Sequence, residues 1–112
     1  FENVTEGDAL YMRTSDGQVG KATASDGTSE AATVVGFANA TAAANTTVKV
    51  IVVGLKTISG LDAGDLYFLS PSTAGAITLT PPSSAGQAVV RLGEAATTTT
   101  LAIQIEPPIK LS

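Results

Sequence analysis

Turn-forming residues interrupt this sequence at short intervals, and the apolar runs between them are too short for helices. Asp-Gly between two apolar runs favours a β-hairpin, because both central positions of a type I′ turn need positive φ. The runs are rich in Val, Ile and Thr, which favour strands. The segments expected to form strands are 9–14, 18–23, 32–39, 46–54, 66–70, 76–80, 88–95 and 101–106. Turn signals between them lie at 15–17, 25–27, 74–75 and 81–84.

The strongest strand pattern lies at 46–54, where Val48, Val50 and Val52 alternate with residues that also become apolar. This pattern predicts a central strand that is buried on both sides. Segment 61–65 has the length of one helical turn, and 40–45 is too short for a stable helix. We therefore expect one all-β domain over 1–112, a small β-sandwich or β-barrel of about eight short antiparallel strands.

A pattern of turn and strand occurs twice, with 57 positions between Gly7 and Gly64. Each copy begins with Gly-Asp, continues through Leu-Tyr into an apolar run, and resumes after a glycine-bearing turn. The repeat predicts two similar four-strand meanders packed face to face, since a small sheet alone would leave its apolar face in water. The alternative is a chance alignment, because Gly-Asp before a strand and Val-Val within one are common.

Charge and composition exclude several classes of protein. The 112 residues carry a formal net charge of -4, and the six basic residues are scattered. A nucleic-acid surface needs clustered Lys and Arg, so no nucleic-acid partner is expected. No apolar run is long enough to span a bilayer, so no membrane partner is expected. The absence of Cys and His excludes disulfides, thiolate zinc sites and the common catalytic triads.

Carboxylates remain as candidates for catalysis, but turn chemistry accounts for most of them. Asp16 and Asp26 lie in turn signals, and Asp62 and Asp65 precede a strand in a turn context. Glu94 is the exception, because it lies inside an otherwise apolar segment, as an edge or bulge residue would. The Asp-Gly turns lack the alternating oxygen ligands of a calcium loop. We therefore expect no enzyme activity, no cofactor and no metal site.

Both ends of the chain have the character of extended arms, over 1–7 and 106–112. Pro107 and Pro108 cannot continue a central ladder, so the chain is expected to leave the sheet there. The residues beyond could then add to a sheet edge of the same molecule or of a partner. The residues expected to bind a partner are Phe1, Glu2, Asn3, Val4, Pro107, Pro108, Ile109, Lys110 and Leu111.

From about Gly7 onward, short motifs follow one another in a fixed order: Gly36–Ala38, Ser59–Leu61, Gly64, Tyr67, Leu69–Ser70, Gly75, Ile77–Thr78, Pro81–Pro82, Leu92–Gly93 and Ala95. In this series the sequence resembles a β-rich domain of tailed-phage virion proteins. In that domain a Ser-Gly-Leu segment leads to Gly-x-x-Tyr-x-Leu-Ser, then Gly-x-(Ile/Leu)-Thr-x-x-Pro-Pro, then (Val/Leu)-Gly-x-Ala and a final strand. One departure is at 66–68, where the family often doubles the tyrosine.

The resemblance implies a structural role at the virion surface. We expect a protein that decorates or cements the capsid by contacts with the major capsid protein or other virion subunits, as a homotrimer. A trimeric tail-fibre, spike or receptor-binding module is the alternative. A lectin or glycan-active enzyme is a third interpretation, and the scarcity of aromatic residues and the absence of His count against it.

Overall fold

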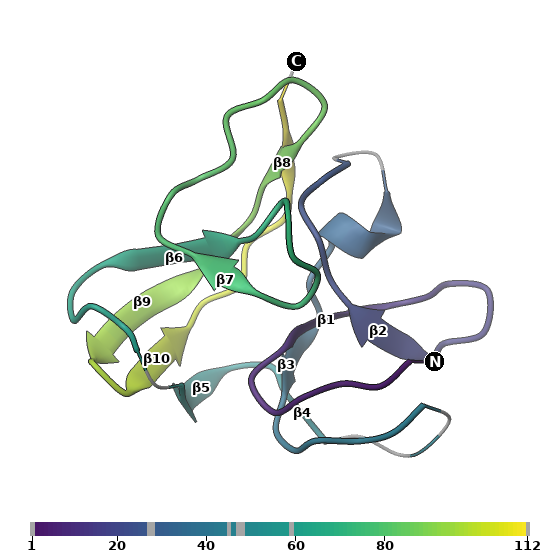
Figure 1. Ribbon diagram of the computed structural model, residues 1–112, viewed down its shortest axis with the longest axis horizontal. Helices are drawn as coiled ribbons and strands as arrows, with labels where there is room; N and C mark the ends of the chain where they lie inside the picture. Colours follow the sequence, from purple (N-terminus) through teal and green to yellow (C-terminus); the bar gives the residue numbers. More distant parts are fainter. Residues whose placement is uncertain (1, 27–28, 45, 47–48, 59, 112) are drawn as a thin grey trace.

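A computed structural model describes residues 2–26, 29–44, 46, 49–58 and 60–111 of the chain. The described part is almost entirely β-structure, which confirms the expected fold class (Figure 1). A single 3₁₀ turn, η1 (Glu30–Ala32), interrupts the strands in these residues. The strands are β1 (Ala9–Met12), β2 (Val19–Lys21), β3 (Gly36–Ala38), β4 (Val50–Ile51), β5 (Gly54–Thr57), β6 (Leu66–Leu69), β7 (Ile77–Thr78), β8 (Ala88–Val89), β9 (Arg91–Thr97), β10 (Thr100–Ile103) and β11 (Ile109–Lys110).

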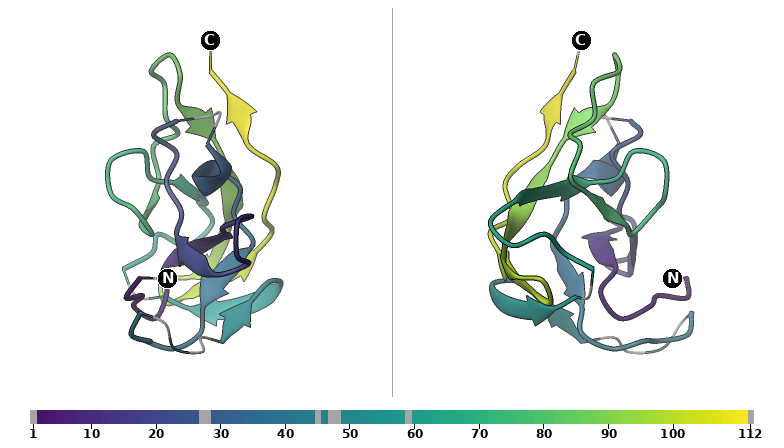
Figure 2. Two further views of the ribbon diagram at one scale, coloured as in Figure 1. Left: turned by 90° about the vertical axis from the view of Figure 1, so that its right-hand side faces the viewer. Right: turned by 60° about the vertical axis from the view of Figure 1, so that its left-hand side comes forward.

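The strands form two principal antiparallel sheets and one small ribbon. The first sheet has the order β2-β1-β3-β4, and the second has the order β5-β10-β9-β6-β7. Strands β11 and β8 form the ribbon, which extends from the second sheet at the top of Figure 1. The molecule is flat, measuring 35 × 33 × 20 Å, and Figure 2 shows it from two further sides. Two antiparallel sheets that share a core are compatible with the predicted small β-sandwich.

The two halves of the chain build their sheets in the same order. Strands β1, β2, β3 and β4 of the first half correspond to β6, β7, β9 and β10 of the second, because β2-β1-β3-β4 matches β7-β6-β9-β10. The pairing of β1 with β3 has the same register as that of β6 with β9, with 57 positions between equivalent residues. Ala9 pairs with Phe37 and Leu10 with Gly36 in the first sheet, as Leu66 pairs with Glu94 and Tyr67 with Gly93 in the second.

The turn that opens each half is also the same. The Asp8 backbone N–H donates to the Thr5 carbonyl at 3.0 Å, and the Asp65 N–H donates to the Asp62 carbonyl at 3.2 Å. The third residue of each turn is a glycine with positive φ, 94° at Gly7 and 87° at Gly64. Glycine adopts this conformation without the steric penalty of a side chain. The repeated Gly-Asp therefore marks one turn, built twice.

Most buried residues belong to one core between the two sheets. From the first sheet, Ala9 and Phe37 enter this core, with Tyr11 and Ile51 packed against it. From the second half come Leu61, Tyr67, Leu69, Val90, Leu92, Ala95, Leu101 and Ile103. A second, smaller cluster lies on the opposite face of the first sheet, where Leu10 and Ala38 contact Val4 of the N-terminal segment.

The prediction of one central strand over 46–54 was wrong. The described part of this segment divides between two edge strands, β4 of the first sheet and β5 of the second. Val52 and Val53, between them, are 59% and 75% exposed. An apolar run does not encode which sheet it joins, so a chain crossing between two sheet edges reads like a buried strand. Residues 47 and 48 lie outside the described part.

Two further predicted strands have different bounds in the structure. The segment 88–95 divides into β8 and β9 at Val90, which is fully buried. The segment 32–39 is extended as a strand only at Gly36–Ala38, after η1. Glu94 lies in β9 beside an irregularity in the pairing with β6, since Tyr67 faces Gly93 while Phe68 faces Arg91. The residue left over at this bulge is Leu92. Glu94 itself pairs with Leu66 and with Ala102 in a central strand, so the expectation of an edge or bulge residue there was wrong.

Candidate interaction surfaces

The N-terminal residues predicted to bind a partner lie against the first sheet of their own molecule. Val4 is 3% exposed and exchanges two backbone hydrogen bonds with Ala42, at 2.9 and 3.0 Å. The Lys21 backbone N–H donates to Glu2 Oε2 at 2.9 Å. Asn3 Oδ1 accepts from the Ala44 N–H at 2.7 Å. Phe1 lies outside the described residues.

An ion pair ties the same segment to the second sheet. Lys56 lies on the edge strand β5, but its side chain is 4% exposed and points inward. Its Nζ donates to Glu6 Oε2 at 2.7 Å. A buried ammonium needs such a partner, because an unpaired charge away from water is costly. Glu6 therefore links the N-terminal segment to β5 across the two halves of the chain.

The C-terminal residues predicted to bind a partner pair with β8. Ile109 faces Val89 and Lys110 faces Ala88. Leu111 extends the pairing, since its N–H donates to Gln87 and its carbonyl accepts from the Gly86 N–H, each at 2.8 Å. The Ile109 side chain is 64% exposed, and Pro107 is exposed while Pro108 is half-buried. Partner binding by either end of the chain stays a prediction.

The two ends of the described chain lie far apart. In all three views of Figures 1 and 2, the N-terminus is low on the molecule and the C-terminus is at its tip. A single small contact therefore cannot include both predicted sets of partner-binding residues.

The structure reveals an exposed apolar strip that sequence reasoning missed. We call it the edge strip and define it as Val52, Val53 and Leu55, whose exposed fractions are 59%, 75% and 65%. The strip connects β4 and β5, which are the outermost strands of their sheets. Apolar residues at an open sheet edge favour pairing with another chain. The apolar run at 46–54 predicts a buried strand, and its pattern does not distinguish burial from exposure at a sheet edge.

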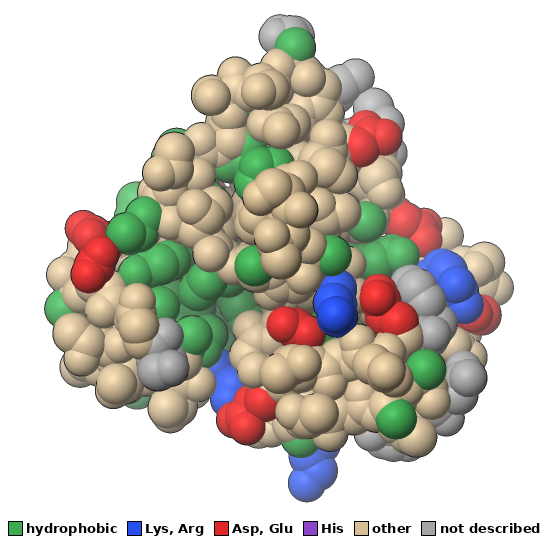
Figure 3. Space-filling model, in the orientation of Figure 1, with side chains coloured by type: hydrophobic (Ala, Val, Ile, Leu, Met, Phe, Trp, Pro, Cys, Tyr) green, Lys and Arg blue, Asp and Glu red, His purple; other side chains and the backbone are tan. Residues whose placement is uncertain are grey.

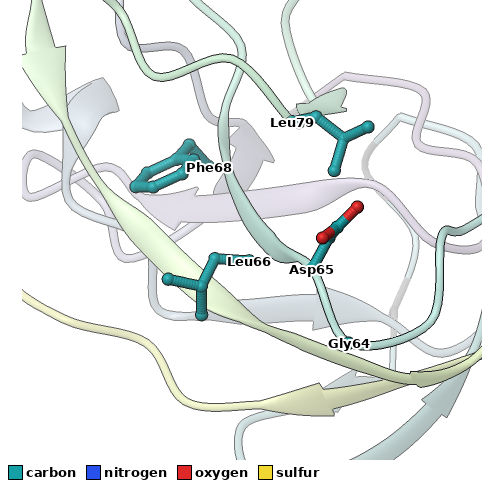
Figure 4. A pocket seen from close by; sticks show the side chains of 5 residues that line it. All are labelled: Gly64, Asp65, Leu66, Phe68 and Leu79. Carbon is teal, nitrogen blue, oxygen red and sulfur yellow. The ribbon is translucent and has the colours of Figure 1, made fainter.

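A second exposed surface, which combines apolar and polar groups, lies on the outer face of the second sheet. We call it the outer groove and define it as Gly64, Asp65, Leu66, Phe68 and Leu79, which line a shallow hollow of about 480 Å³. Figure 3 shows hydrophobic side chains gathered over the second sheet, with acidic side chains at their margin. In Figure 4, Leu66 and Phe68 extend from the same side of β6, and the Asp65 carboxylate turns toward Leu79.

Several carboxylates accept hydrogen bonds from neighbouring groups of their own chain. Asp8 Oδ2 accepts from the Thr5 N–H at 2.8 Å, and Glu30 accepts from the N–H and hydroxyl of Thr14. The hydrogen bond from the Arg13 guanidinium and a second from the Gln18 N–H lower the pKa of Asp16 to about 2. In the described ranges, no three Asp or Glu side chains gather as metal ligands would, and no helix has the length and hydropathy to cross a membrane.

Comparison with protein-family models, with curated protein sequences and with solved structures found no match to this chain.

Proposed function

We propose that this chain is a virion structural protein of a tailed phage that decorates or cements the capsid surface by contacts with coat subunits. The observation that carries the proposal is the edge strip. Three large apolar side chains stand in water, next to each other, where two sheets end. Burying such a strip stabilises an assembly by about 25 cal/mol for each Å² of apolar surface removed from water.

The two sheets of one molecule have their outermost strands at two different sides. Strands β4 and β5 form one side of the molecule, and the opposite edges of the two sheets are β2 and β7. Contact between the edge strip of one copy and a different edge of the next is head-to-tail, and such contacts form a ring where the rotation between copies closes. A homotrimer on the capsid surface is the assembly that we propose.

The residues that carry the resemblance to phage virion proteins lie at turns and in the core. Gly64 forms the turn before β6, and Leu61, Tyr67 and Leu92 are buried. The Tyr67 hydroxyl accepts from the Asp62 N–H at 2.8 Å, which fixes this turn against the sheet. A motif made of such positions specifies a framework, and this supports a structural role in preference to a chemical one.

A tail-fibre or spike module is a second candidate. The separation of the termini favours it, because the chain enters low on the molecule and leaves at its tip (Figures 1 and 2). Modules threaded one after another along a fibre need this arrangement.

Cryo-electron microscopy of particles purified from the source tests the proposal. We expect density that fits the chain on the outer capsid surface, in clusters of three, touching coat subunits. Density in the tail fibres would replace the first candidate with the second. Absence of the chain from purified particles, measured by mass spectrometry of the same sample, would overturn both.

A further inference from the structure

The outer face of the second sheet carries a row of side chains aligned across four strands. Leu55 of β5 faces Ala102 of β10, Ala102 faces Glu94 of β9, and Glu94 faces Leu66 of β6. Their neighbours along the strands point into the core, so this row points to solvent. Leu66 and Leu79 of the outer groove are 36% and 41% exposed. The face is therefore open, and its row combines apolar side chains with the Glu94 carboxylate.

The repeat allows residues of this face to be compared with the equivalent residues of the first sheet. The residues equivalent to Leu66, Phe68, Glu94 and Ala102 are Ala9, Tyr11, Phe37 and Ile51. In the first sheet this face is covered by protein, since Ala9 and Phe37 are fully buried in the shared core. In the described structure, only the equivalent face of the second sheet remains uncovered.

The charged side chains on the outer face of the second sheet indicate which kind of partner would cover it. Asp65 lines the outer groove, and Glu94 lies next to Leu66 on the adjacent strand. In the described structure neither carboxylate takes part in an ion pair, whereas Arg91, which faces Phe68 on the same side of the sheet, is paired with Glu106. If another molecule of this chain lay face to face on this sheet, the four carboxylates of the two molecules would come together and repel each other. A segment carrying Lys or Arg beside apolar side chains would instead pair with them, and charged groups placed this way select partners.

We propose that the outer groove binds a segment of a coat subunit in which apolar side chains alternate with Lys or Arg. This inference rests on the proposed capsid role, because it identifies which surface of the chain the coat subunit meets. The apolar side chains occupy the hollow between Leu66, Phe68 and Leu79, and the cations meet Asp65 and Glu94. The edge strip remains available for contacts between copies.

The test uses the full chain and a ten-residue probe peptide of alternating Leu and Lys, with a Leu-Glu peptide as its counterpart. NMR chemical shifts of the ¹⁵N-labelled chain report where each peptide binds. We expect saturable shifts at the amides of 64–68, 79 and 94 with the Leu-Lys peptide and none with the Leu-Glu peptide. Shifts spread evenly over the acidic surface, or equal binding of both peptides, would overturn the proposal.

Two pairs of variants separate the groove from general attraction between opposite charges. Glu94→Gln and Glu30→Gln change the net charge equally, but Glu30 lies in η1 of the first half, where its carboxylate accepts from Thr14. Leu66→Thr and Met12→Thr each remove an exposed apolar side chain from a strand, one in the groove and one on β1. We expect Leu66→Thr to weaken binding about tenfold and Glu94→Gln about fivefold, which corresponds to about 1 kcal/mol or slightly more. Equal effects within either pair would contradict the inference.

The failure of this inference differs from the failure of the proposed function. If the chain lies on the capsid but its groove is covered by another copy, sedimentation will show that Leu66→Thr dissociates the oligomer, and the occupant proposed here is wrong. If the chain is absent from particles, the capsid role is wrong whatever the peptide does. Thermal unfolding of each variant within a few degrees of the unchanged chain shows that the fold is retained.

Discussion

Gly36 and Gly93 occupy equivalent positions in the two sheets, and a neighbouring strand leaves neither of them room for a side chain. A Cβ at Gly36 would lie 2.8 Å from the Ile51 carbonyl oxygen and would also meet the Val50 side chain. A Cβ at Gly93 would meet the carbonyl oxygen of Ala102, the residue equivalent to Ile51. The two halves of the chain thus share a packing constraint as well as a strand order.

Replacement of Gly93 by Ala should destabilise the fold strongly. The added methyl meets backbone, which cannot move aside without disturbing the ladder between β9 and β10. We expect a loss of about 2–4 kcal/mol in the free energy of unfolding, since overpacking typically costs 1–3 kcal/mol and backbone yields less than side chains. Urea unfolding followed by circular dichroism measures this loss.

The matched control is Gly17→Ala, because a Cβ there meets nothing within 4 Å and only the positive φ of 72° opposes it. We expect this variant to lose about 1 kcal/mol. Equal losses at Gly17 and Gly93 would show that the close approach at Gly93 does not constrain the sheet.

The ion pair between Glu6 and Lys56 should contribute to stability through the burial of the ammonium. Glu6→Gln leaves Lys56, which is 4% exposed, with an uncharged partner. Because Glu6 itself is 56% exposed, water screens part of the effect, and we expect a loss of about 1–2 kcal/mol. Urea unfolding again provides the measurement.

Glu106→Gln is the control, since its contact with Arg91 is 3.7 Å long and both side chains are substantially exposed. That change should cost less than about 0.5 kcal/mol. With Lys56→Met in place, Glu6→Gln should have little further effect. A cost for Glu6→Gln that is the same with Lys or Met at position 56 would refute the pair's role.

Stability should fall as the pH is lowered through the titration of Asp16. The bonds from Arg13 and Gln18 hold the pKa of Asp16 at about 2, below its usual 3.8. A carboxyl whose pKa is lowered by folding stabilises the folded chain above its unfolded pKa, and this contribution is lost as pH falls toward 2. In the Asp16→Asn variant, the unfolding midpoint should change less between pH 4 and pH 2 than it does in the unchanged chain. An identical pH profile for the variant would contradict this.

The sequence predicted what depends on local chemistry. The Gly-Asp turns, the strand at Leu66–Leu69 and the twofold occurrence of the turn-and-strand pattern follow from turn residues and alternation, which act over a few positions. The predicted meander order was wrong, because β1 lies between β2 and β3, and β6 lies between β7 and β9. It could not predict which sheet Val50 and Leu55 join, because both edges accept the same apolar pattern. The outer groove escaped prediction for a similar reason. Leu66 and Tyr67 are both apolar, and only the packing of the two sheets decides which of them is exposed.

Deletion of 106–112 should weaken assembly more than it weakens the fold. The segment pairs with β8 through β11, and the side chain of Ile109 in β11 is 64% exposed. We expect the unfolding temperature to fall by a few degrees and the binding of the chain to particles to fall about tenfold or more. Parallel loss of both properties would show that the segment serves the fold alone.

Assembly through the edge strip is tested most directly by Val53→Asp. Val53 is 75% exposed in the described structure, so a carboxylate there should leave the unfolding temperature unchanged while opposing burial against a neighbour. Ser83→Asp adds the same charge at an exposed turn and is the matched control. The decisive measurement is the number of copies bound to particles that lack the chain. We predict saturable binding for the unchanged chain and for Ser83→Asp, and a loss of at least about tenfold for Val53→Asp; full binding of Val53→Asp would contradict the account.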